Sequence, residues 1–302
     1  MIKLQTATKY IKPLKVFTYG PTFSGKTLSS LLLANGVVQS IHNCTEAEAW
    51  SHIVLIDTEY GRGALYSNLG AYNYIQIEAP FTTEKLNNIL TELNTMNEID
   101  CIVIDSMTHF WSKEGGLLEQ KVIVDANGGN SYSNWLGIGA KLNTTIEIIL
   151  KSPKHMFITA RAKSDTALLA DAKGKMVPKT FGLKPDLREG FDYECDITFN
   201  IDKEDHSLLV EKGLPGMQSS YPMATPELGK ELYNLTKEGA STYIRTKDEL
   251  CESIKNLTKK NQELIQFLAL KLSGKKLVDL ELNELNAIEK EVISLIRKQQ
   301  VK

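Results

Sequence analysis

The sequence predicts an α/β fold, a mostly parallel sheet flanked by helices, with a small helical appendage at the C-terminal end. Short apolar runs of strand type are spread over the chain as far as residue 210, and helical patterns lie between several of them. Residues 20–27 read Gly-Pro-Thr-Phe-Ser-Gly-Lys-Thr, a complete phosphate-binding loop that stands between a strand pattern and a helix pattern.

The expected strands are near-continuous apolar runs, as in a sheet that is buried on both faces. They are residues 16–19, 53–56, 74–77, 101–104, 156–159, 197–201 and 208–210. Between them, apolar residues at helical spacing predict helices over residues 28–38, 83–96 and 135–150. This alternation favours parallel strands joined by right-handed crossovers.

The composition changes near residue 224, so we expect an α/β core over residues 1–224 and a helical domain over residues 225–302. A helical pattern opens at Thr225, and Thr246 with Glu249 forms the signature of a capping box before the next one. Two further patterns cover about 260–272 and 282–298. Their leucine stripes favour packing against one another, and the helices are also a possible site for a protein partner.

Composition bounds the class of protein. The chain has 302 residues, of which 42% are hydrophobic and 24% charged, with a net charge of −2. This excludes a globally basic nucleic-acid binder but not a local basic patch. The four cysteines show no C-x-x-C spacing, which favours reduced thiols in the cytoplasm. Since no apolar run approaches the length of a membrane span, we expect no membrane partner.

The phosphate-binding loop indicates a nucleoside triphosphate site. Gly20 and Gly25 allow a tight turn whose backbone N–H groups point inward. Lys26 would reach the β- and γ-phosphates, and the Thr27 hydroxyl would hold Mg²⁺. The expected nucleotide-binding residues are Gly20, Pro21, Thr22, Phe23, Ser24, Gly25, Lys26, Thr27 and Leu28. The alternative is an ordinary surface turn.

Acidic residues end two of the expected strands. Asp57 and Glu59 follow the strand at 53–56, where a carboxylate could activate the water that attacks the γ-phosphate. The alternative is a solvated strand end or a cap for the next turn. Asp105 follows the run 101–104, a Walker B pattern, and would bind Mg²⁺ opposite Thr27.

The strand at 156–159 leads into Thr159, Ala160 and Arg161. A polar side chain here could sense the γ-phosphate and pass its state to the following segment. Arg161 is the best candidate, and the alternative is a surface arginine.

Together these motifs resemble the RecA-like recombinase ATPases, most closely the short RecA-like ATPases of bacteriophages that act with single-strand annealing. The resemblance spans residues 14–215. It rests on the segments 20–27, 55–59, 102–106, 157–163 and 189–196. It implies a P-loop NTPase core of RecA type with ATP and Mg²⁺ as cofactors. It also implies that Glu59 is the catalytic base. With Lys26, Asp105 and Arg161 from the motifs above, this completes the expected catalytic residues.

The resemblance further implies single-stranded DNA as partner, bound by two mobile loops at about 112–133 and 163–182, and a homo-oligomer. Residues 151–190 hold nine Lys or Arg against four Asp or Glu, which suits a phosphate backbone. The expected DNA-binding residues are Lys163, Lys173, Lys175 and Lys179. The alternative is a solvated loop.

RecA-like filaments insert basic residues across the subunit interface, and the resemblance places Lys212 at a similar position. This chain lacks a second lysine two residues further on. We also expect the coupling between nucleotide and DNA to differ from that in RecA, because Ala160 and Arg161 stand where RecA has a residue with an amide side chain.

Three functions remain open. The leading one is an ATP-dependent, single-stranded-DNA-binding ATPase of recombination, annealing or repair, in the bacterial host cytoplasm if phage-encoded. The second is a ring-forming motor of helicase or packaging type. The third is a nucleotide-gated adaptor with little hydrolysis, whose C-terminal helices recruit a partner. ATPase assays with and without single-stranded DNA separate them.

Overall fold

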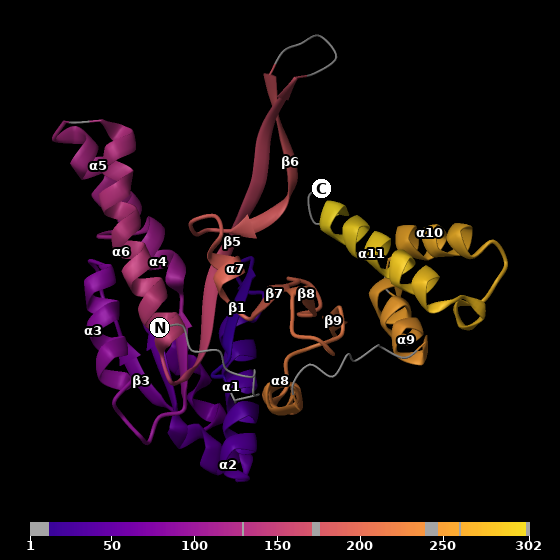
Figure 1. Ribbon diagram of the computed structural model, residues 1–302, viewed down its shortest axis with the longest axis horizontal. Coiled ribbons are helices and arrows are strands. Elements are labelled where there is room, and N and C mark those ends of the chain that lie inside the picture. Colours follow the sequence, from indigo (N-terminus) through magenta and orange to yellow (C-terminus); the bar gives the residue numbers. More distant parts are fainter. Residues whose placement is uncertain (1–11, 129, 171–175, 239–246, 260, 300–302) are drawn as a thin grey trace, which may run out of the picture.

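The protein's structure, a computed structural model, describes residues 12–128, 130–170, 176–238, 247–259 and 261–299. These residues form one nine-stranded sheet with helices on both faces (Figure 1). The strands are β1 (Lys15–Gly20), β2 (Ile53–Asp57), β3 (Asn73–Gln76), β4 (Cys101–Asp105), β5 (His155–Ala170), β6 (Met176–Pro185), β7 (Ile197–Ile201), β8 (Leu208–Lys212) and β9 (Ser220–Tyr221).

The strand order is β3-β2-β4-β5-β1-β7-β8-β9, with β6 paired to β5 alone. From β3 to β7 all neighbours run parallel. Strands β8 and β9 continue the sheet antiparallel. The predicted, mostly parallel α/β sheet is therefore confirmed.

The helices fall where the helical patterns predicted them, with additions. They are α1 (Lys26–His42), α2 (Glu46–Ala49), α3 (Thr83–Leu93), α4 (Met107–Ser112), α5 (Leu117–Ala126), α6 (Ser131–Lys151), α7 (Phe191–Glu194), α8 (Pro226–Glu238), α9 (Lys247–Thr258), α10 (Gln262–Leu272) and α11 (Leu282–Gln299). Short 3₁₀ turns are η1 (Trp50–His52), η2 (Arg62–Leu69) and η3 (Leu277–Asp279). No helix among the described residues has the length and apolarity needed to span a bilayer.

Alternation along the strands divides the core into two clusters, one on each face of the sheet. Val54 and Ile56 point into the cluster that α3 and α6 cover. Ile53 and Leu55 point into the cluster that α1 and α8 cover. Each face therefore has its own helical layer, and only the edges of the sheet are left for ligands.

Helix α8 packs with the core although it lies in the segment 225–302. Leu228 and Leu232 are buried in the cluster of α1. The two helices meet at glycines, since a Cβ added at Gly36 would lie 1.8 Å from the carbonyl oxygen of Pro226. The boundary expected at residue 224 stays a prediction, and this packing leads us to propose that it follows Glu238.

The two segments expected as mobile loops contain regular structure, and this expectation is corrected. Residues 162–170 of β5 pair antiparallel with β6, which makes a long hairpin that stands out from the sheet (Figure 1). Helix α5 occupies the first segment, where the ammonium of Lys121 donates to Asp125 and to Ser131 at the start of α6. In their described parts, both segments therefore form hydrogen-bonded helix or strand in place of loops.

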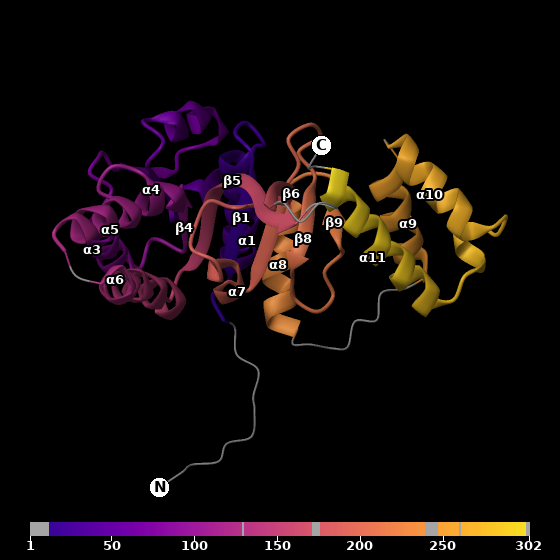
Figure 2. The same ribbon diagram turned by 90° about the horizontal axis from the view of Figure 1, so that it is seen from above.

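Helices α9, α10 and α11 form a third cluster of their own, set beside the sheet edge at β9 (Figure 2). Its core includes Leu250, Leu264 and Val292. The hydroxyl of Ser219, next to β9, donates to Glu289 of α11 at 2.6 Å. The leucine stripes of α9–α11 therefore pack on one another as predicted, whereas that of α8 packs on the core. The predicted capping box at Thr246 and Glu249 lies outside the described residues.

Candidate active site

Three neighbouring strands, β2, β4 and β5, bring the predicted acids and Arg161 to one edge of the sheet. In the order of the sheet these strands end beside the phosphate-binding loop, which follows β1. Gly20 and Arg161 are paired positions of β1 and β5, and Asp57 and Asp105 are paired positions of β2 and β4. This carboxyl edge is where open α/β sheets bind ligands.

The loop after β1 has the geometry of an anion cradle. Gly25 caps α1 with a φ of 88°, which favours glycine, and Gly20 has no room for a side chain, since its Cβ would lie 2.7 Å from the carbonyl oxygen of Ile201. The buried hydroxyl of Ser24 has no hydrogen-bond partner among the described residues. The start of α1 therefore offers unsatisfied donors to a phosphate.

Lys26 is folded back onto this loop. Its ammonium donates to the carbonyl oxygens of Gly20 at 3.1 Å and Pro21 at 2.7 Å. Burial lowers the pKa of Lys26, and the charges of Asp105 and Glu59 act in the opposite direction. An incoming phosphate would give this partly buried ammonium a stronger partner than the two carbonyls.

Thr27 and Asp105 meet as the motifs predict. The Thr27 hydroxyl donates to Oδ2 of Asp105 at 2.5 Å, and the Thr159 hydroxyl donates to Oδ1 at 2.5 Å. Burial raises the pKa of Asp105, while these two hydrogen bonds and the charge of Lys26 lower it in part. A buried carboxylate that prefers neutrality in the absence of a cation is a suitable ligand for one.

The donor set at Thr27 and Asp105 consists of oxygens, which fits Mg²⁺. The unsatisfied Ser24 hydroxyl and the glycine-lined turn fit a polyphosphate. These residues would hold the two cofactors that the sequence predicts.

Glu59 is held by Arg161 in a bidentate ion pair. Arg161 donates from Nε to Oε1 at 3.0 Å and from Nη2 to Oε2 at 2.5 Å. Burial raises the pKa of Glu59, but the guanidinium of Arg161 and the nearby Arg62 lower it by more, so the net shift is downward. The predicted base and the predicted sensor are thus bonded to each other, and neither is a free surface group.

Sequence reasoning did not identify His109 as part of this site. Its Nδ1 lies 2.7 Å from the Thr58 hydroxyl and 3.8 Å from Oε1 of Glu59. Burial lowers the pKa of His109 to about 4, against the opposing charge of Glu59. A single histidine in a short helix carries no motif, and only the fold brings α4 against the end of β2.

Asp57, the other acid after β2, has a structural place. Its Oδ1 accepts from the backbone N–H of Glu59 at 2.5 Å. Its Oδ2 accepts from the N–H of Gly63 at 2.8 Å and from the hydroxyl of Tyr74 at 2.6 Å. Asp57 therefore caps the turn that presents Glu59, the alternative that the sequence left open for an acid at this strand end.

The residues expected to contact DNA are only partly described. Lys163 lies on β5 and pairs with Asp186 at 2.9 Å. Lys173 and Lys175 lie outside the described residues, as does the side chain of Lys179. Lys212 donates to the carbonyl oxygens of Tyr193 at 2.6 Å and Cys195 at 2.5 Å within its own chain. Their roles stay predictions.

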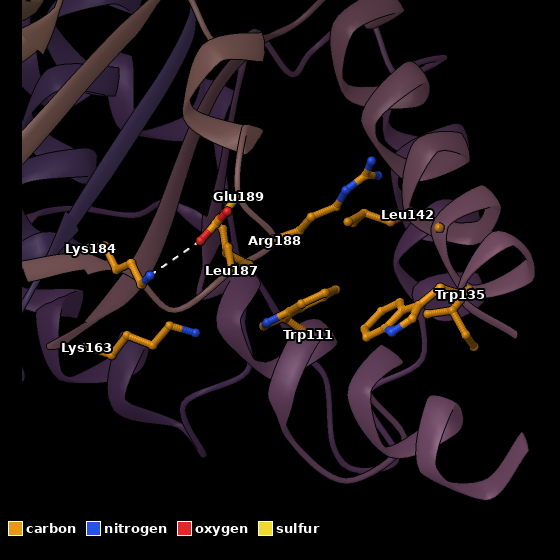
Figure 3. Close-up of a pocket in the computed structure, with 10 residues that line it drawn as sticks. Trp111, Trp135, Leu142, Lys163, Lys184, Leu187, Arg188 and Glu189 are labelled. Carbon is orange, nitrogen blue, oxygen red and sulfur yellow. Dashed lines mark hydrogen bonds and ion pairs between the residues drawn. The ribbon is translucent and has the colours of Figure 1, made fainter. Parts of the chain in front are cut away.

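A cavity of about 490 Å³ lies between α4, α6 and the base of the hairpin (Figure 3). Its wall includes Trp111 and Trp135, whose rings are stacked with their centroids 6.1 Å apart. Lys163, Lys184 and Arg188 lie at its rim (Figure 3). Sequence reasoning did not identify this site, because its residues come from four separate segments.

The comparisons with known proteins agree with this geometry at the level of the domain. A family model described as AAA domain matches residues 12–245, which is more than half of the chain. No curated protein sequence matches the chain significantly. The matched range contains the whole phosphate edge and also helix α8.

Proposed function

The chain belongs to the AAA domain family, and from this premise we propose that it is an ATP-hydrolysing, single-stranded-DNA-binding protein of DNA recombination, annealing or repair, akin to the short RecA-like ATPases of bacteriophages. The family gives an AAA-type ATPase domain. Substrate DNA, Mg²⁺ dependence and oligomerisation are parts of the proposal. The observation that carries it is that Arg161, at the edge of the sheet beside the phosphate-binding loop, contacts α4, which helps to line the cavity with Trp111.

The proposed reaction is in-line attack of water on the γ-phosphate, which breaks the bond between the γ-phosphorus and the bridging oxygen and releases ADP. Lys26 and the loop N–H groups stabilise the charge of the phosphates, and Thr27 with Asp105 would hold Mg²⁺, which would supply further charge neutralisation. Glu59 accepts the proton of the attacking water once Arg161 has released it. The bound γ-phosphate is the natural new partner for Arg161, since it offers oxygens to the same guanidinium.

Two contacts join this chemistry to the cavity. Arg161 and Lys163 are two residues apart on β5, so both side chains lie on one face of the strand. Helix α4 begins two residues after Asp105 and carries Trp111, and its Thr108 hydroxyl accepts from the N–H of Arg161 at 2.9 Å. A shift of Arg161 would therefore displace two parts of the cavity wall, β5 at Lys163 and α4 at Trp111.

The cavity suits a base of a single strand with its phosphate. Trp135 is partly exposed while Trp111 lies behind it, so a base can stack on an indole that is already supported. Two of the rim cations are paired with acids, Lys163 with Asp186 and Lys184 with Asp165 and Glu189. A phosphate must displace these carboxylates, so we expect DNA affinity to fall steeply with salt.

Steady-state ATP hydrolysis with and without single-stranded DNA tests the proposal. Arg161 occupies both oxygens of Glu59 in the structure. We expect slow turnover with ATP alone and faster turnover with DNA, because DNA bound in the cavity would act on Arg161 through β5 and α4 and help it to leave Glu59. Lys26→Ala removes the ammonium aimed at the phosphates and should abolish both rates. Turnover within twofold of the parent in this variant would refute the active site.

The DNA site has its own test. Trp135→Ala should weaken single-stranded DNA binding about tenfold, because stacking on an aromatic ring contributes about 1–3 kcal/mol per base. Leu136→Ala is the matched control, since Leu136 is an exposed neighbour on α6 that does not line the cavity. Equal affinity of the two variants would refute the cavity as the DNA site.

The adaptor function is the second candidate, and the Glu59–Arg161 pair favours it over the ring motor. A base whose oxygens are both engaged is poorly placed for hydrolysis. Nucleotide binding without turnover, in the presence as well as the absence of DNA, would establish the adaptor.

A further inference from the structure

A second group of polar side chains lies at the amino-terminal edge of the sheet, opposite the phosphate edge. His42 ends α1, His52 ends η1 just before β2, and Asp100 precedes β4. Helix α1 runs from the phosphate-binding loop down to this edge, where it meets α2 (Figure 1). The group is therefore independent of the proposed nucleotide and DNA sites.

The three side chains converge on one oxygen. Nε2 of His42 lies 2.6 Å from Oδ2 of Asp100, and Nδ1 of His52 lies 3.0 Å from the same oxygen. The two imidazole rings face each other with centroids 4.3 Å apart and planes inclined by 30°. All three ligand atoms lie within 4.8 Å of one another.

The backbone fixes this arrangement. The N–H of Asp100 donates to the carbonyl oxygen of His52 at 2.9 Å, and the carbonyl oxygen of Asp100 accepts from the N–H of His155 at 2.9 Å. Asp100 and His52 are thus held by the hydrogen bonding between β2, β4 and β5. Only the side chains need to rotate for a small ion to enter between them.

Hydrogen bonding alone leaves the group incomplete. His42 Nε2 meets the geometry of a hydrogen bond with Asp100. His52 Nδ1 is buried and finds no properly oriented hydrogen-bond partner among the described residues, although it lies close to the carboxylate. A cation would use the lone pairs of both nitrogens and the carboxylate oxygen at once.

We propose that His42, His52 and Asp100 form a binding site for a divalent transition-metal ion of the zinc type. Two imidazole nitrogens with one carboxylate oxygen are a ligand set for Zn²⁺ and its neighbours, whereas Mg²⁺ selects oxygen ligands alone. Water completes the coordination, because His42 and Asp100 are partly exposed. The ion connects the end of α1 to the starts of β2 and β4, and so stabilises the fold.

Equilibrium dialysis of the nucleotide-free full chain against Zn²⁺, followed by metal analysis, tests the site. We expect one Zn²⁺ bound at this site per chain and a melting temperature about 5 °C higher at a hundredfold excess over the dissociation constant. His52→Asn and Asp100→Asn should each lose that ion and the rise in melting temperature. Mg²⁺ in place of Zn²⁺ should give no rise.

Glu98→Gln is the matched control, because Glu98 is an exposed acid two residues before Asp100. This substitution removes the same charge as Asp100→Asn. It should keep the Zn²⁺. All three variants should keep the parent's ATP binding, which shows that they fold. Absence of Zn²⁺ uptake by the parent, or equal uptake by the parent and His52→Asn, would overturn the proposal.

Discussion

At the scale of single residues, the ion pair between Glu59 and Arg161 explains how the proposed site could bind a nucleotide without hydrolysing it at once. Arg161 keeps the pKa of Glu59 low although the carboxylate is largely buried, so this proposed base is ionised. Both of its oxygens, however, already accept hydrogen bonds from Arg161. His109, whose pKa burial lowers to about 4, stays neutral beside it. In the proposed mechanism, hydrolysis therefore depends on a new partner for Arg161, and the γ-phosphate of ATP offers one.

Glu59→Gln should bind ATP and hydrolyse it roughly 10²–10⁴ times more slowly, because the amide keeps the shape of the side chain and loses the base. Asp57→Asn should lower the free energy of unfolding instead, since Asp57 accepts two hydrogen bonds from its turn and one from the hydroxyl of Tyr74 on β3. Single-turnover hydrolysis and urea unfolding of both variants separate the roles. Lost turnover in Asp57→Asn with normal stability and normal turnover in Glu59→Gln would reverse the assignment.

The site residues carried by motifs could be predicted from the sequence, and the rest could not. Lys26, Thr27 and Asp105 lie at fixed distances from glycines or strand ends, and the strand order brings them together. His109 and Trp111 come from a short helix with no motif. Their roles arise only from long-range packing, which local patterns do not encode.

At the scale of elements, predictability follows the same division. Buried parallel strands are continuous apolar runs, so β1, β2 and β4 could be found from composition alone. The hairpin strand β6 contains two prolines and a glycine and has no alternation of apolar residues, so nothing local marks it as a strand. Pairing with the long β5 creates it.

The next prediction concerns the three lysines expected to contact DNA in the segment 163–182. Reversing the charge of Lys173, Lys175 and Lys179 should weaken single-stranded DNA binding and flatten its salt dependence, because each lost phosphate contact lowers the log–log slope by about 0.7. ATP binding without DNA should not change. Filter binding over a range of salt concentrations measures the slope, and an unchanged slope would mean that these lysines contact no phosphate.

The junction of β1 and β5 predicts a dependence of stability on pH. Burial and the charge of Lys15 lower the pKa of His155 from 6.5 to about 4, and its Nδ1 accepts from the N–H of Leu14 at 3.1 Å. Between these values the unfolded chain binds a proton that the folded chain does not. The free energy of unfolding therefore falls as the pH falls from 6.5 to 4.

His155→Asn keeps an acceptor for Leu14 and does not titrate. Between pH 7 and pH 4.5 it should lose about 2 kcal/mol less free energy of unfolding than the parent. Urea unfolding at the two pH values measures the difference, and equal losses in variant and parent would show that His155 does not titrate in this range.

At the scale of the whole molecule, three apolar clusters divide the described chain into two sets. The clusters on the two faces of the sheet share its strands and include α8, whereas α9–α11 bury their leucines among themselves. The family match also ends at residue 245, after α8. Both observations favour an ATPase core that ends between α8 and α9, with a helical unit attached to it.

A chain shortened to residues 1–245 should fold and bind ATP, whereas one shortened to 1–224 should not, because it exposes the face of α1 that Leu228, Leu232 and Tyr233 cover. Limited proteolysis of the full chain should give a first stable fragment that ends after Glu238. A stable, ATP-binding fragment 1–224 would restore the boundary expected from the sequence.

The contact between α1 and α8 can also be tested in the full chain, without truncation. Gly36→Ala places a methyl group 1.8 Å from the carbonyl oxygen of Pro226, so the helices must separate and the melting temperature should fall by several degrees. Gly137→Ala is the matched control in another long helix, α6, because no described atom lies within 4 Å of its added Cβ. Alanine favours a helix over glycine by about 1 kcal/mol, so this control should be neutral or stabilising. If thermal unfolding of the two variants is the same, α8 is not part of the core, and the division of the molecule after Glu238 is wrong.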